Sequence, residues 1–182
     1  MTPAADARVD ESQPDLNRGT GKQLRVDGDK GARVESYFVF RVRGLTGPVA
    51  KATLRVYSLM DTKAGPSVYA ASSDWTEGGI TWANRPARTS DALDSVSAVS
   101  ASTWVEFDVT AVVTTSGVYT FVLETDSTDG MNMNSREAAT NRPELVIYIG
   151  SGSTQSGAAP IATWTPSPPA SADLSPRRFV FG

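Results

Sequence analysis

The sequence lacks both cysteine and histidine. Without them the protein can form neither disulfides nor a Cys-His or Ser-His-Asp catalytic group, and it lacks the usual ligands of Zn²⁺ and Cu²⁺. Any bound metal must therefore take oxygen ligands, which favours a hard cation such as Ca²⁺.

Long apolar runs and charge of one sign are missing too. No run approaches the roughly 18 apolar residues that span a bilayer, and the net charge is only −3, with acidic and basic residues interspersed. We therefore expect no membrane insertion and no nucleic-acid partner. No window has the pattern of a long helix, whereas 15 glycines, 11 prolines and many Ser, Thr and Val residues favour an all-β fold.

Short segments with alternating apolar and polar residues run through most of the chain, and this period of two predicts β-strands. The segments are residues 5–10, 22–27, 33–43, 51–59, 66–71, 103–109, 117–125, 131–137 and 144–150. Turn signals about every ten residues predict an antiparallel two-sheet β-sandwich, and the long connections favour a jelly roll. The alternation places these residues in one core: Phe38, Phe40, Leu54, Val56, Phe107, Phe121, Leu123 and Ile147.

The composition changes at residue 151 to Gly, Ser, Thr, Ala and Pro. Such a segment cannot bury a core of its own. We therefore expect residues 1–150 to form one module and residues 151–182 to be a linker or tail.

Two tryptophans, Trp75 and Trp82, lie seven residues apart in the polar segment SDWTEGGITWANRP at 73–86. The segment predicts a loop, a short strand at 80–82 and a further turn. The two indoles either pack against a core or are displayed for a ligand. We favour packing, because tryptophan usually lies where it buries area.

The alternation also directs a set of basic and tyrosine side chains away from the core. They are Arg25, Tyr37, Arg41, Arg55 and Tyr57. Guanidinium groups pair with carboxylates and tyrosine rings can stack on sugars, so a surface of this composition suits an acidic glycan. The alternative is that acidic neighbours such as Glu35 and Glu106 hold these arginines in ordinary surface ion pairs.

An ordered set of motifs resembles the DNRLRE-type domains of secreted bacterial and archaeal proteins. The motifs are ADARVD, PDLNRGTGKQLRV, YFVFRV, KATLRVY, DWTEGGITWANRP, WVEFDVT and NSREAATNRPELVI, which together cover residues 5–149. The resemblance implies a jelly-roll module that is often attached to neighbouring domains. Some relatives bind acidic polysaccharides such as alginate, which implies a secreted or cell-surface protein that binds carbohydrate.

The resemblance and the polar loops together suggest a structural Ca²⁺ site. Its candidate ligands are Asp6, Asn17, Asp108, Ser135 and Glu137. Each of them can instead act as a turn or cap residue. The spacing D-x-D-x-G at 27–31 lacks the carboxylate that an EF-hand loop needs twelve positions from its start, so a turn is favoured there.

Three functions remain open at this point. The first is a non-catalytic carbohydrate-binding module, and the second is a structural or adhesive spacer in a larger assembly. The third is a glycoside-cleaving enzyme with carboxylates such as Glu77 and Glu106, but no spacing distinguishes any pair. We favour the binding module and expect no catalytic activity.

Overall fold

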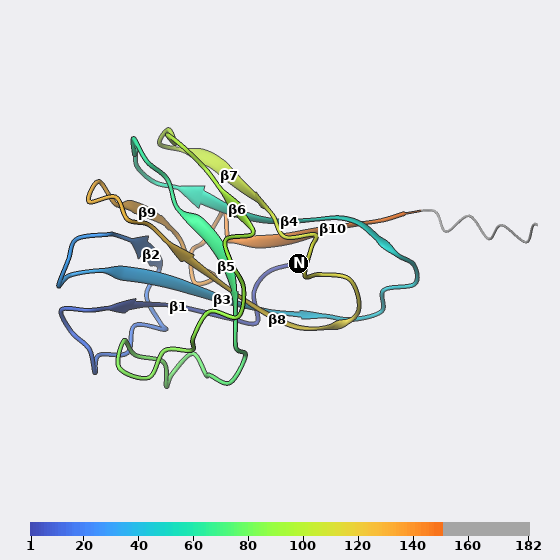
Figure 1. Ribbon diagram of the computed structural model, residues 1–182, viewed down its shortest axis with the longest axis horizontal. Coiled ribbons are helices and arrows are strands. Elements are labelled where there is room, and N and C mark those ends of the chain that lie inside the picture. Colours follow the sequence, from blue (N-terminus) through green and yellow to red (C-terminus); the bar gives the residue numbers. More distant parts are fainter. Residues whose placement is uncertain (151–182) are drawn as a thin grey trace, which may run out of the picture. The chain divides into compact units, whose positions relative to one another are not determined.

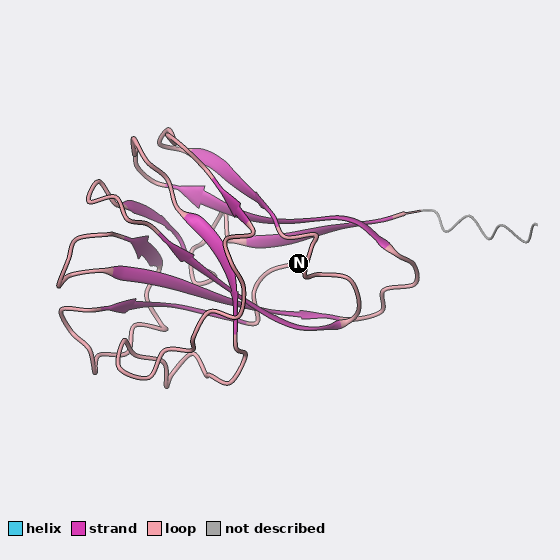
Figure 2. Cartoon of the chain, in the orientation of Figure 1, coloured by secondary structure: helices cyan, strands magenta, loops and turns pink. Residues whose placement is uncertain are grey.

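The computed structural model describes residues 1–150, which form ten β-strands and contain no helix (Figures 1 and 2). The strands are β1 (Ala5–Asp10), β2 (Gln23–Val26), β3 (Val34–Val42), β4 (Val49–Ser58), β5 (Ser67–Ala71), β6 (Asp94–Ser95), β7 (Thr103–Asp108), β8 (Gly117–Glu124), β9 (Met131–Asn134) and β10 (Glu144–Ile149). The expected linker or tail at 151–182 lies outside the described residues. No helix in the described part of the chain is long and apolar enough to cross a membrane.

The strands form two sheets, and every pairing is antiparallel. Sheet A has the order β1-β3-β8-β5-β6, and sheet B has the order β10-β4-β9-β2, with β7 also paired to β4. The first five strands alternate between the sheets, which is the kind of crossing expected of a jelly roll. The predicted all-β antiparallel sandwich is confirmed.

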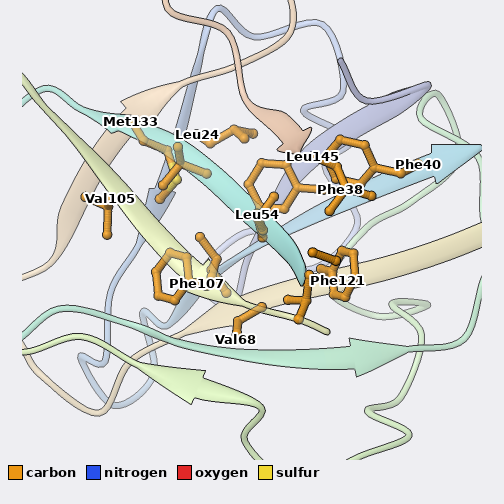
Figure 3. Packing of buried hydrophobic residues seen from close by; sticks show 14 of the residues in the cluster. Leu24, Phe38, Phe40, Leu54, Val68, Val105, Phe107, Phe121, Met133 and Leu145 are labelled. Carbon is orange, nitrogen blue, oxygen red and sulfur yellow. The ribbon is translucent and has the colours of Figure 1, made fainter. Parts of the chain in front are cut away.

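The main core lies between the two sheets, as Figure 3 shows for side chains from both. Phe40 and Phe121 of sheet A pack as a tilted pair with ring centroids 6.2 Å apart, and Leu54 and Phe107 of sheet B are completely buried. All eight predicted core residues belong to this cluster or, in the case of Ile147, pack against it. Alternation therefore identified the inward face of each of these strands correctly.

Two local predictions were wrong. Residues 80–82 do not form a strand: the segment has turns at 77–79 and 82–84, packs on a sheet through side chains and joins no β-ladder. Residues 87–102 were not among the predicted strands, but β6 lies there and pairs with β5 at the edge of sheet A. Only two residues form β6, so no alternation pattern could indicate it.

Candidate functional site

The segment 72–86 covers the outer face of sheet A (Figure 1, green loops beside β1). Ile80 is buried there, and Trp75 and Trp82 are half-buried against a second cluster that includes Tyr37 and Val122. Tyr37 and Val122 are cross-strand neighbours on β3 and β8. The packing interpretation of the two tryptophans is confirmed, but they cover a sheet face that we had expected to meet solvent.

This cover overturns the predicted role of Tyr37 as an exposed ligand-binding residue. Its side chain is only 1% exposed and meets Trp75 edge-on at 6.1 Å. Its hydroxyl donates to Glu35 Oε2 at 2.8 Å, and burial raises the tyrosine pKa above its usual range. Alternation correctly placed Tyr37 on the outer face of β3, but the segment 72–86 closes that face.

The other predicted glycan-binding residues do not form one surface. Arg41 extends from β3 on the outer side of sheet A, whereas Arg25, Arg55 and Tyr57 lie on the outer side of sheet B. The two sides are opposite faces of the sandwich. A single polysaccharide chain in one groove therefore cannot contact all of these residues.

The arginines on sheet B are already occupied by acidic neighbours. Arg55 pairs with Glu106 at 2.8 Å and also with Glu144, and its guanidinium lies 4.5 Å from the centre of the Trp104 ring. Arg25 pairs with Asp27. The alternative expectation of surface ion pairs is thus correct for Arg55, which pairs with the expected Glu106, whereas the partner of Arg25 is the buried Asp27.

A shallow groove of about 270 Å³ lies beside Arg55 on this face, and Tyr148, 60% exposed, forms part of it. Tyr57 packs edge-on against Trp104 at 5.4 Å instead of presenting its ring flat to solvent. The outer face of sheet B therefore offers one well-exposed aromatic ring, that of Tyr148. It lies beside Arg55, which is already paired with two carboxylates.

A larger groove of about 440 Å³ lies where the segment 72–86 meets the end of β3. Its lining includes Val39, Arg41, Ser73, Trp75, Glu77 and Val118, and we call it the Arg41–Trp75 groove. Val118 is 47% exposed and contributes an apolar surface. Arg41 is exposed and forms no ion pair within residues 1–150.

A second hollow of about 610 Å³ adjoins this groove. Both are lined by Ser73, Trp75 and Thr76, and the second extends to Ile80 and Asn84. The two hollows meet at Trp75. Arg41 lines only the first of them, so the guanidinium belongs to the Arg41–Trp75 groove and not to the second hollow.

Three carboxylates from distant parts of the sequence converge near one end of the groove. They are Asp6 on β1, Glu77 in the segment 72–86 and Glu137 just after β9, and we call them the acidic cluster. One oxygen of each lies within 4.8 Å of the others. Arg136 lies beside them, with its Nε 2.7 Å from Glu137 Oε1 and 3.2 Å from Glu77 Oε1.

The structure brings together four of the five predicted metal ligands, although only two of them belong to the acidic cluster. Asn17 donates to the backbone carbonyls of Glu77 and Ile80, both at 2.7 Å, so its amide holds the loop. Ser135 Oγ accepts from the backbone of Glu137 at 3.1 Å. These are the capping roles that we considered as the alternative.

Asp108 does not join the other predicted ligands. It lies on β7 in sheet B, where hydrogen bonds from the hydroxyl and backbone of Thr110 lower its pKa. It is not part of the acidic cluster.

The model of carbohydrate-binding module family 96 matches residues 1–149, which is most of the chain. The chain belongs to this family. None of the curated proteins matches it. The expected resemblance to a carbohydrate-binding jelly-roll module is therefore confirmed, and residues 1–149 carry it.

In this family 96 module, sequence reasoning missed the roles of Trp75 and Glu77. Trp75 was considered chiefly as a packing residue, but it both packs on sheet A and lines the groove. Glu77 was considered only as a candidate catalytic carboxylate, and no sequence signal linked it to Asp6 or Glu137. Those contacts exist because the segment 72–86 folds back onto sheet A.

Proposed function

We propose that this protein is a secreted or surface module that binds an acidic polysaccharide without cleaving it, and that the polysaccharide lies in the Arg41–Trp75 groove. Membership of a carbohydrate-binding family supports glycan binding. One observation carries the location: Arg41 and Trp75 line the same groove, and Arg41 has no ion-pair partner among residues 1–150.

The chemistry of this groove suits a uronic-acid polymer. A guanidinium group can hold a carboxylate through two parallel hydrogen bonds, and an indole ring supplies an apolar surface for a sugar ring. Arg41 can make such a contact without leaving another partner. Arg55 would first have to release Glu106 and Glu144, which is an energetic cost that Arg41 does not have.

The acidic cluster supports binding rather than cleavage. Burial, together with the nearby carboxylates of Glu137 and Glu77, raises the pKa of Asp6 to about 8, a value that a general acid could use. However, the Asp6 side chain is only 1% exposed, so it cannot reach a glycosidic oxygen. Glu77 is held by Arg136 and by the backbone amide of Asp6, whose N lies 2.9 Å from Glu77 Oε1.

The first prediction compares two arginine variants to determine which face of the sandwich binds the polysaccharide. Arg41→Ala should weaken binding to alginate or polygalacturonate roughly tenfold, because a hydrogen bond to a charged group contributes about 1.5–3 kcal/mol. Arg55→Ala is the matched control on the opposite face and should retain wild-type affinity. Affinity electrophoresis and calorimetry with these polymers and a neutral glucan measure the effect.

Salt provides a second criterion in the same experiment. Charge contacts at an exposed site are screened over about 8 Å at 0.15 M ionic strength, so retention on the acidic gels should fall as salt rises. Equal loss in both variants would contradict the proposed location. If the wild-type protein binds none of the polymers, the remaining hypothesis is a structural or adhesive spacer that contacts neighbouring domains.

A further inference from the structure

The acidic cluster contains two buried oxygens whose hydrogen-bonding capacity is not used. Asp6 Oδ1 and Glu137 Oε2 are both buried and have no partner within the described residues. Asp6 Oδ2, in contrast, accepts from the backbone amide of Arg136 at 2.7 Å. Buried carboxylate oxygens normally have hydrogen-bond partners, because an unpaired buried oxygen has lost its contacts with water and gained nothing in their place.

We propose that these oxygens bind a calcium ion, which Asp6, Glu77 and Glu137 hold between β1, the segment 72–86 and the turn after β9. One carboxylate oxygen of each of the three residues lies within 4.8 Å of those of the other two, a span that one ion can bridge with bonds of about 2.4 Å. Calcium accepts irregular oxygen ligands at this distance, whereas magnesium requires shorter bonds of about 2.0–2.1 Å in an octahedral arrangement.

The local charge also favours a divalent cation. When all three carboxylates are ionised, they and the Arg136 guanidinium carry a net charge of −2, which one calcium ion cancels. Arg136 does not occupy the two orphaned oxygens, because its contacts are with Oε1 of each glutamate and with the Ala4 carbonyl. Arg136 is therefore part of the cluster, but it leaves Asp6 Oδ1 and Glu137 Oε2 without a hydrogen bond.

The competing explanation is a proton on Asp6, since the raised pKa of about 8 favours the neutral acid at pH 7 when no cation is bound. The two explanations differ in their response to calcium. A protonated Asp6 needs no metal, so calcium would change neither the stability of the protein nor any binding signal.

The test uses the full chain dialysed against EDTA and then titrated with CaCl₂, followed by calorimetry and thermal unfolding. Calcium at about 100 times its Kd should raise the Tm by roughly 5–10 °C, because a ligand that binds only the folded state stabilises it. Magnesium at the same concentration should have a clearly smaller effect. Terbium luminescence excited through tryptophan gives a direct binding signal, because Trp75 and Glu77 line the same groove.

Substitutions inside and outside the acidic cluster test whether calcium binds at this cluster. Glu137→Gln should lower calcium affinity at least tenfold, whereas Asp108→Asn, which changes a carboxylate outside the cluster, should leave it unchanged. Asp6→Asn should unfold near the wild-type temperature in EDTA, because the amide replaces a carboxyl group that is neutral at pH 7 when no cation is bound, but it should lose the calcium-dependent increase. The EDTA measurement shows that this variant folds.

The proposal is overturned if millimolar calcium changes neither the Tm nor the heat signal of the wild-type protein, or if Glu137→Gln responds like the wild type. A magnesium effect equal to that of calcium would contradict the identity of the ion. All of these measurements are made without polysaccharide, so their outcome is independent of glycan binding.

Discussion

Glu124 shows how the folded structure changes the chemistry of a single side chain. Its carboxylate lies at the end of β8, with only 16% of the side chain exposed, and pairs with Arg88 at 2.8 Å. Burial and the nearby carboxylate of Glu35 outweigh that arginine and raise the pKa of Glu124 to about 7. The folded protein therefore favours the protonated form, and ionisation of Glu124 opposes folding.

The sign of the resulting pH dependence follows from proton linkage. Between pH 4.5 and 7 the folded state binds the Glu124 proton more tightly than the unfolded state, so this residue's stabilising contribution is complete below pH 4.5 and is lost as pH rises through 7. Glu124→Gln should therefore gain stability relative to the wild type over this range, on the order of 2–3 kcal/mol. Urea unfolding at several pH values measures the difference, and Glu106→Gln, at an exposed position, is the control. A wild-type-to-variant difference that stays constant from about pH 4.5 to 7.5 would contradict the assignment.

At the scale of elements, the segment 72–86 is held by contacts in its middle and near its C-terminal end. Asn17 binds the carbonyls of Glu77 and Ile80, and Arg85 donates to Glu35 Oε2 at 2.9 Å while stacking on Trp82 at 3.6 Å. These contacts hold an irregular segment against a sheet. If calcium also binds Glu77, the ion fixes the wall that this residue contributes to the Arg41–Trp75 groove.

Substitutions at two glycines test whether the close packing of the segment 72–86 is required for stability. A Cβ at Gly19 would lie 2.1 Å from the Glu77 carbonyl oxygen, so Gly19→Ala must displace the loop and should cost about 1–3 kcal/mol. Gly78→Ala lies within the segment and meets nothing within 4 Å, so it should be nearly neutral. Urea unfolding gives both values. A Gly19→Ala protein as stable as the wild type would mean that the close approach is not required.

At the scale of the whole molecule, residues 1–150 contain both sheets, the main core between them and the covering segment on sheet A. The family match ends at residue 149, near the end of this unit. The two outer faces of the sandwich differ in the surface that they present. One carries a covering segment with a large groove, and the other presents paired charges and an exposed tyrosine.

A shortened chain tests whether this unit is sufficient. A protein ending at residue 150 should keep the Tm of the full chain within about 2 °C, because its core lies between the two sheets and a shift of that size corresponds to about 1 kcal/mol or less. It should also retain the same polysaccharides in affinity electrophoresis. A lower Tm together with lost retention would show that residues 151–182 contribute to the folded module.

The sequence alone determined most of the strands and the inward face of most of them. A period of two is a local property, because successive side chains of a strand must point to opposite sides. The alternation of apolar and polar residues is therefore sufficient to assign Phe40, Leu54, Phe107 and Phe121 to the core. The absence of cysteine and histidine likewise limited any metal site to oxygen ligands.

Only the tertiary structure decided what covers each outward face and which distant residues meet. Alternation shows that Tyr37 and Arg41 share one side of β3, but not that the segment 72–86 buries the first and leaves the second exposed. In the same way, strand patterns cannot show that Arg41 and Arg55 lie on opposite sides of the sandwich. Asp6, Glu77 and Glu137 converge because three segments far apart in sequence pack together, and no local pattern contains that information.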